Sequence, residues 1–227
     1  MRILLFVFLI IRVLVSGCAG HSFDVPFTEP DVVVKKPVLY LYPEEQMQVN
    51  VVFESQSLIK CSYPFYYPSG WLVNADPDGH LVDAVDGMEY YALYYEMNLP
   101  DFNVDFDTGY VVEKSDYVRF LNDKCKTLGL NYKETNEFII YWLSLMQEYD
   151  YVFVHFLTTA DVNELMPLNI YTSDDGFPDT TIRVWMYWKG LDKPFEVDGQ
   201  NLLPVERSGF TVVEWGGIDG NSGFDVK

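Results

Sequence analysis

Three glutamates stand at positions where a carboxylate could take part in acid–base chemistry. Glu96 ends an aromatic run, Glu137 lies in a helical pattern, and Glu214 lies inside the apolar segment "GFTVVEW". Glycoside hydrolases use two carboxyl groups about 5 to 10 Å apart across an open cleft. One hypothesis is therefore a hydrolase of the cell envelope in which Glu214 is catalytic together with Glu96 or Glu137.

A structural role for Glu214 is the alternative that the sequence favours. In a strand, Glu214 shares its face with Phe210 and Val212, and a buried carboxylate is costly unless it is paired. Beyond the first twenty residues the chain has three arginines, and Arg183 alone lies within a β-rich run, between Ile182 and Val184. We therefore expect an internal Glu214–Arg183 ion pair.

Aromatic side chains are the second kind of candidate, because they make up 17% of the chain. The segment "YPFYYPSGW" (63–71) is broken by Pro and Gly and is predicted to be a loop. Its aromatic rings either form a platform for a sugar or belong to a β core, and both interpretations stay open. The candidate ligand-binding residues are Trp71, Tyr67, Tyr66, Arg183 and Arg207.

A calcium site is disfavoured at "NADPDG". Asn74, Asp76, Asp78 and Gly79 match the first positions of an EF-hand loop, but the twelfth position is Val85 in place of Glu. A hairpin turn between two strands explains the same residues without a metal.

Other catalytic sets are not found in the sequence. The three histidines are far apart in the chain, and His155 alternates with Phe153 and Leu157 in a strand pattern typical of a core or edge residue. There is no G-x-S-x-G motif and no glycine-rich loop opening a helix. We expect no metal and no cofactor.

The first eighteen residues have the pattern of an export signal. Arg2 precedes an apolar run, and "VSGC" at 15–18 resembles the lipobox at which bacterial lipoproteins are acylated on cysteine. Arg12, inside the apolar run, departs from that pattern. The resemblance implies a lipid anchor on Cys18 in a bacterial membrane; an ordinary secretory signal or an uncleaved anchor are the alternatives.

The net charge limits the class of binding partner, and the cysteine content bears on whether the chain forms a disulfide. A net charge of −19 without a basic stripe argues against binding to nucleic acid. Cys61 and Cys125 are left once Cys18 is set aside; they form either one disulfide or two buried thiols.

The elements that must position these residues fall into one globular unit, 36–217, between a tether (19–35) and a flexible tail (218–227). Strand patterns occupy 38–42, 47–53 and 89–96, and 71–84 is predicted to be a hairpin of two strands joined by the Asp-Pro-Asp-Gly turn. Two helices are predicted, one starting near Ser115 and one with capping-box spacing at Asn131 and Glu134. Strands return at 151–157, 180–188 and 209–215. The predicted fold class is α+β, an antiparallel sheet or sandwich with a helical hairpin packed on one side.

The chain also resembles an uncharacterised family of bacterial exported proteins. That family has the motifs KPVIYLYP, EFIVYWLP and R-x-GFTVVEWGG, and this chain has "KPVLYLYP" (36–43), "EFIIYWLSLM" (137–146) and "RSGFTVVEWGG" (207–217). The resemblance implies one folded unit and brings no activity, cofactor or site residue.

The leading functional hypothesis is an exported, lipid-anchored surface domain without catalytic activity, which binds a glycan or another envelope component through aromatic residues. The envelope hydrolase is the first alternative. A purely structural interaction protein without a small-molecule site is the second.

Overall fold

The computed structural model describes residues 32–99, 102, 106–174 and 176–221. The predicted export signal and most of the predicted tether lie outside these residues. Strand β1 begins at Val32, inside the segment expected to be tether, because Val32 and Val34 are buried and pair with Leu99 and Met97 of β7.

Twelve strands and three α-helices make up the described chain. The helices are α1 (Tyr117–Thr127), α2 (Tyr132–Met146) and α3 (Thr159–Leu165). The strands are β1 (Val32–Tyr42), β2 (Met47–Phe53), β3 (Ile59–Tyr63), β4 (Trp71–Ala75), β5 (Leu81–Asp83), β6 (Glu89–Tyr90), β7 (Leu93–Leu99), β8 (Tyr110–Glu113), β9 (Tyr151–Leu157), β10 (Leu168–Thr172), β11 (Thr180–Leu191) and β12 (Thr211–Asp219).

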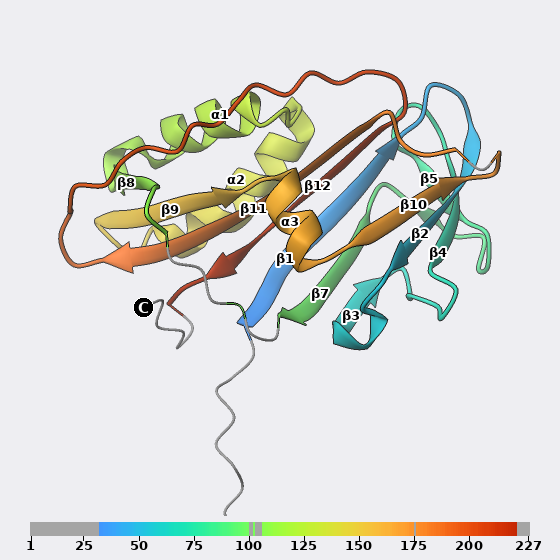
Figure 1. The fold of residues 1–227 in the computed structure, drawn as a ribbon, viewed down its shortest axis with the longest axis horizontal. Coiled ribbons are helices and arrows are strands. Elements are labelled where there is room, and N and C mark those ends of the chain that lie inside the picture. Colours follow the sequence, from blue (N-terminus) through green and yellow to red (C-terminus); the bar gives the residue numbers. More distant parts are fainter. Residues whose placement is uncertain (1–31, 100–101, 103–105, 175, 222–227) are drawn as a thin grey trace, which may run out of the picture.

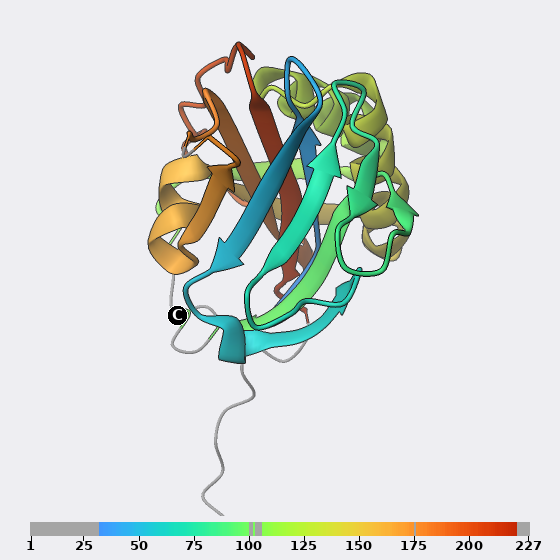
Figure 2. The same ribbon diagram turned by 90° about the vertical axis from the view of Figure 1, so that its right-hand side faces the viewer.

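These elements form two sheets and a helical layer, which confirms the predicted α+β class. The larger sheet has the order β3-β7-β1-β12-β11-β9-β8, and the smaller has the order β10-β2-β4-β5-β6. Helices α1 and α2 contact each other and cover one face of the larger sheet (Figure 1). The smaller sheet covers the opposite face. Figure 2 shows the larger sheet between the smaller sheet and the helices.

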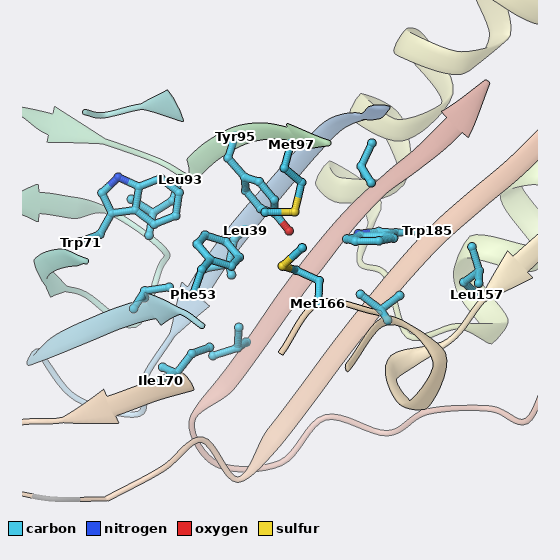
Figure 3. Packing of buried hydrophobic residues seen from close by; sticks show 14 of the residues in the cluster. Leu39, Phe53, Trp71, Leu93, Tyr95, Met97, Leu157, Met166, Ile170 and Trp185 are labelled. Carbon is cyan, nitrogen blue, oxygen red and sulfur yellow. The ribbon is translucent and has the colours of Figure 1, made fainter. Parts of the chain in front are cut away.

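Each face of the larger sheet has its own apolar core. The core between the two sheets includes Leu39, Phe53, Trp71, Tyr95 and Trp185 (Figure 3). Met166, at the end of α3, packs against the same core, so α3 covers the part of that face beside β9 and β11. The core under the helices contains different side chains: Tyr40, Phe138, Trp142, Val213 and Trp215 among others.

The last strand of the chain lies in the middle of the larger sheet. β12 pairs antiparallel with β1 on one side and parallel with β11 on the other. Parallel neighbours need a crossover, and residues 192–210 supply it; we call this segment the strap. Figure 1 shows the strap running from the end of β11 past β8 and along α1 before it enters β12.

Glycine often ends a strand, but the final strand does not end at the two glycines of "EWGG". β12 continues through Gly216 and Gly217 to Asp219. A β-carbon at Gly217 would come within 2.3 Å of the Met186 carbonyl oxygen and 2.6 Å of the Trp142 ring. At Gly216 it would come within 3.0 Å of Pro37. The glycines therefore let α2 and the irregular part of β1 pack directly on the backbone of β12.

The predicted N-cap is confirmed for α2, whereas α1 starts one residue later than a cap at Ser115 would require. Asn131 caps α2, with its side chain accepting from the Glu134 amide while the Glu134 carboxylate accepts from the Asn131 amide. α1 starts after a short 3-10 turn that contains Ser115, and Asp116 occupies its N-cap position in place of Ser115. Helix α3 was not expected from the sequence.

Candidate functional site

Glu214 is completely buried between the sheets, and both of its carboxylate oxygens are engaged. Oε1 accepts hydrogen bonds from the Trp185 indole (2.6 Å) and the Tyr95 hydroxyl (2.9 Å). Oε2 accepts from Nε of Arg183 at 3.0 Å. A carboxylate that accepts hydrogen bonds from three residues in this way is satisfied in the core.

Arg183 is held from the other side by α3 and the residues just after it. Nη1 donates to Oδ1 of Asn163 (2.8 Å) and to the Met166 carbonyl (2.6 Å). Burial lowers the pKa of Arg183, but the charges and hydrogen bonds of Glu214 and Tyr95 together leave the pKa raised. The expected Glu214–Arg183 ion pair is therefore present, and neither residue borders an open cleft.

The other two candidate carboxylates lie on the opposite face of the larger sheet. Tyr95 faces Glu214, so its neighbour Glu96 points to the helical side, where its Oε2 lies 4.0 Å from the Cys61 sulfur. Glu137, in α2, accepts a hydrogen bond from the Tyr40 hydroxyl at 2.7 Å. The structure thus separates Glu214 from Glu96 and Glu137 by the thickness of the sheet, and the arrangement required of the hydrolase is not formed.

Trp71 belongs to the core and not to a ligand platform. Its side chain is fully buried, donates from Nε1 to the Pro64 carbonyl (3.0 Å), and packs edge-on against Tyr66 and Phe53. Tyr66 is half-buried and its hydroxyl accepts from the Phe53 amide. Trp71 is the first residue of β4, and its side chain points into the core between the sheets. The rings of Trp71 and Tyr66 therefore hold the 63–71 segment against the small sheet.

Arg207 fixes the strap to the start of α2. Its guanidinium donates to the Gly129 carbonyl (2.8 Å) and forms an ion pair with the buried carboxylate of Glu134. These contacts connect the strap to the capping box of α2. Arg207 therefore has a structural role and does not share a ligand site with Arg183.

Exposed aromatic rings occur elsewhere, on two segments that contact each other. Tyr63 and Phe65 are 64% and 67% exposed, and Tyr91 is 64% exposed. Tyr63 contacts the ring of Tyr90 at 5.2 Å, which places the two segments side by side. We call Tyr63, Phe65, Tyr67, Tyr90 and Tyr91 the aromatic surface.

Polar groups border this aromatic surface. The Tyr90 hydroxyl donates to the Asp86 carboxylate at 3.1 Å. The Tyr91 ring lies 6.5 Å from that of Tyr40, which bonds Glu137. Burial first, and then the charge of Glu137, raise the pKa of Tyr91. Rings for stacking and carboxylates for accepting hydrogen bonds therefore occur together.

The sequence did not reveal Tyr90 and Tyr91 as surface residues. The run 89–96 was predicted as one strand, but β6 ends at Tyr90 in the small sheet and β7 begins at Leu93 in the large one. Tyr91 lies at the corner where the chain changes sheets and is exposed for that reason. The doubled aromatic "YY", which breaks a strict alternation, was the available signal.

A groove of about 660 Å³ lies beside the edge strand β8. Its floor is residues 109–113, one wall is α1, and the other is the strap around Pro194 and Val197. None of the candidate residues chosen from the sequence lines it.

The "NADPDG" turn and the two described histidines have structural partners. Asp76, Gly79 and His80 form the tight turn between β4 and β5, and the Asp76 carboxylate binds the His80 ring at 3.0 Å. His155 donates from Nδ1 to the Thr108 carbonyl (2.7 Å). Among the described residues, no group of His, Cys, Asp or Glu is arranged to hold a metal ion.

Comparison with protein-family models, curated proteins and solved structures found no match. Within the described chain, none of the helices is both long and apolar enough to cross a membrane.

Proposed function

We propose that this chain is an exported, lipid-anchored binding domain that holds a glycan of the bacterial envelope on its aromatic surface, without catalysing a reaction. The observation that carries the proposal is the exposure of Tyr63, Phe65 and Tyr91 on adjoining segments. Large exposed apolar patches on soluble domains mark binding sites. The proposed site differs from the one expected from the sequence, because Trp71 is buried and the exposed rings near it in the chain take the role that Trp71 was expected to have.

The chemistry of the aromatic surface suits a sugar. Tyrosine presents a flat apolar ring and a polar hydroxyl, so it packs against the C–H face of a pyranose while keeping contact with water. Carboxylates accept strong hydrogen bonds from hydroxyl groups, and Asp86 and Glu137 stand beside Tyr90 and Tyr91. A binding role is favoured over hydrolysis because the Glu214 carboxylate is buried and saturated.

The proposed location rests on the first eighteen residues. A lipid on Cys18 would hold the domain at a membrane, and the following residues would separate the domain from it. Metabolic labelling with an alkyne-bearing palmitate tests this part: we expect label on the wild-type chain and none on Cys18→Ser. Label retained by Cys18→Ser contradicts the anchor.

The glycan proposal is tested by retention on insoluble peptidoglycan and by a glycan array. The double variant Phe65→Ala/Tyr91→Ala should lose retention at least about tenfold, as expected for central aromatic contacts. Tyr132→Ala/Phe177→Ala is the matched control, because these two rings are 72% and 68% exposed and lie outside the aromatic surface. Equal retention by both double variants, or no retention by the wild type on any glycan, would overturn the proposal.

A further inference from the structure

Two tyrosines of the aromatic surface meet nearly at a right angle beside a carboxylate. The rings of Tyr63 and Tyr90 are 5.2 Å apart with an interplanar angle of 81°, and Tyr63 is 64% exposed. The Tyr90 hydroxyl donates to Oδ2 of Asp86 at 3.1 Å. The face of a tyrosine ring attracts a cation, and a carboxylate attracts it as well. The three side chains thus combine two kinds of group that bind an ammonium ion.

Asp83 adds a buried carboxylate to the same place. In the β5–β6 hairpin Leu81 pairs with Tyr90, and Asp83 follows Leu81 by two residues, so the side chains of Asp83 and Tyr90 lie on one face of the hairpin. Asp83 is 1% exposed, and its Oδ1 atom accepts from the amides of Val85 and Asp86. Its Oδ2 atom has no hydrogen-bond partner among the described residues. Such an oxygen in a native structure indicates a partner that the chain itself does not supply.

The negative charge at this place is not compensated by a neighbouring cation. Among the described residues, neither Asp83 nor Asp86 forms an ion pair. Burial first, then the hydrogen bond and the charge of Asp86, with smaller effects of Tyr63 and Asp83, raise the pKa of Tyr90 to about 12. The charges of both carboxylates therefore act at the Tyr90 hydroxyl, where they also favour a bound cation.

We infer that the glycan held on the aromatic surface carries free amino groups, as a de-N-acetylated hexosamine does, and that Tyr63, Tyr90 and Asp86 hold one of its ammonium groups. The inference rests on the proposed function, because both tyrosines belong to the aromatic surface. The ammonium group packs against the tyrosine rings and donates to the Asp86 carboxylate. The buried charge of Asp83 acts on it from behind the Tyr90 ring.

The neighbouring rings favour an amino sugar over a basic peptide. Phe65 and Tyr67 follow Tyr63 in the same segment, and their rings contact each other at 5.0 Å. Their flat faces can pack against the next sugar units of a chain. A lysine side chain also brings an ammonium group, but its flexible stem does not use these flat faces.

Calorimetric titration of the full chain with two matched oligosaccharides tests the inference. The linear tetramer of glucosamine has an amino group on each ring, and the tetramer of N-acetylglucosamine has the same backbone without these charges. We expect the amino tetramer to bind at least about tenfold more tightly than the acetylated one. Its binding should weaken as salt increases. Tetralysine, which is cationic but has no sugar rings, should bind at least about tenfold more weakly than the amino tetramer.

Variants of Asp86 and Tyr63 locate the binding. Asp86→Asn keeps the acceptor for the Met88 amide but removes the charge, so it should weaken binding of the amino tetramer about tenfold. Glu164→Gln is the matched control, because it removes one charge from an exposed position in α3, which packs beside β9 and β11. Tyr63→Phe keeps the ring face and should bind as the wild type does, whereas Tyr63→Leu should lose about tenfold. Asp86→Asn decides the outcome if Tyr63→Leu does not fold.

The outcomes separate this inference from the proposed function. Equal binding of the two tetramers, or equal losses in Asp86→Asn and Glu164→Gln, would overturn the inference and leave the glycan proposal standing. Tetralysine binding as tightly as the amino tetramer would show attraction by net charge or by a basic peptide, and would also overturn the inference. Retention on peptidoglycan without binding of either tetramer overturns the inference alone. Failure of both measurements overturns the inference and the proposed function together.

Discussion

Arg183 and Glu214 are directly opposite each other on the parallel strands β11 and β12, with Nε and Oε2 3.0 Å apart and no exposed side-chain surface on either residue. The pair joins the centre of the larger sheet to α3, because Arg183 also donates to Asn163 and Met166. Removing one partner of a buried pair leaves a desolvated charge, which is more costly than the pair itself.

We therefore expect Arg183→Met to lower the free energy of unfolding by about 3 to 5 kcal/mol. Arg183→Met/Glu214→Gln should be less destabilised than Arg183→Met alone, since no charge is then buried without a partner. Urea denaturation followed by circular dichroism measures both. Arg119→Met is the control, because its surface pair with Asp116 should contribute under about 1 kcal/mol. Equal losses from Arg183→Met and Arg119→Met would contradict the structural role.

The pKa values of the two described histidines should be shifted in opposite directions from that of a free histidine. Burial lowers the pKa of His155, whereas the hydrogen bond to Asp76 raises the pKa of His80. Two-dimensional NMR of the imidazole resonances should give a midpoint below about 6.5 for His155 and above it for His80. Asp76→Asn should return the His80 midpoint toward 6.5 and leave His155 unchanged. Equal midpoints in the wild type would contradict the described contacts.

His155 also gives stability a pH dependence. A histidine whose folded-state pKa is lowered binds its proton more readily when unfolded, so stability falls as pH drops below about 6.5 toward the folded-state pKa. The Nε2 atom accepts from the Gln200 amide at 3.2 Å, and protonation would place two donors against each other. Thermal unfolding between pH 5 and 8 should show a smaller decrease for His155→Gln than for the wild type. A steeper decrease in the variant contradicts this assignment.

The close approach of Trp142 to β12 makes Gly217 intolerant of any side chain. Gly217→Ala places a methyl group 2.3 Å from a carbonyl oxygen and 2.6 Å from the Trp142 ring. We expect a loss of about 1 to 3 kcal/mol in unfolding free energy, as for other overpacked cores. Gly199→Ala, whose nearest atom would be 3.6 Å away, should be nearly neutral. A neutral Gly217→Ala would show that the helical layer can shift away from β12.

The cysteines should behave as two unlike thiols. Cys61 is exposed on β3, whereas Cys125 is buried in α1 and burial raises its pKa to about 12. Iodoacetamide should therefore alkylate Cys61 in the native protein and Cys125 after unfolding, as read by peptide mass spectrometry. A Cys61–Cys125 disulfide in the purified protein would contradict the structure, in which both are free.

Local signals in the sequence were sufficient for much of the fold. The capping box at Asn131 and the turn at Asp76–Gly79 involve neighbours in the chain, and both form as expected. The Glu214–Arg183 pair also followed from simple reasoning, because a strand arginine was the natural partner for a strand carboxylate. These predictions did not require knowledge of which sheet each strand joins.

The assignment of strands to sheets was not available from local patterns. An aromatic residue such as Trp71 has the same neighbours in sequence whether it faces a core or solvent, and β4 in the small sheet decided that it is buried. The separation of Glu214 from Glu137 depended likewise on which sheet face each side chain points from. The groove at β8 required the strap to return beside an edge 90 residues earlier in the chain, as in the Tyr110–Gln200 contact.

The position of β12 has a consequence for biosynthesis. Its neighbours, β1 and β11, come from the beginning and the late part of the described chain, and neither pairs with the other. Until β12 has been synthesised and has docked, the larger sheet exists as two halves with unpaired edges. A folding intermediate that lacks β12 therefore exposes the edges of β1 and β11, and insertion of this single strand joins the early and late parts of the chain in one step.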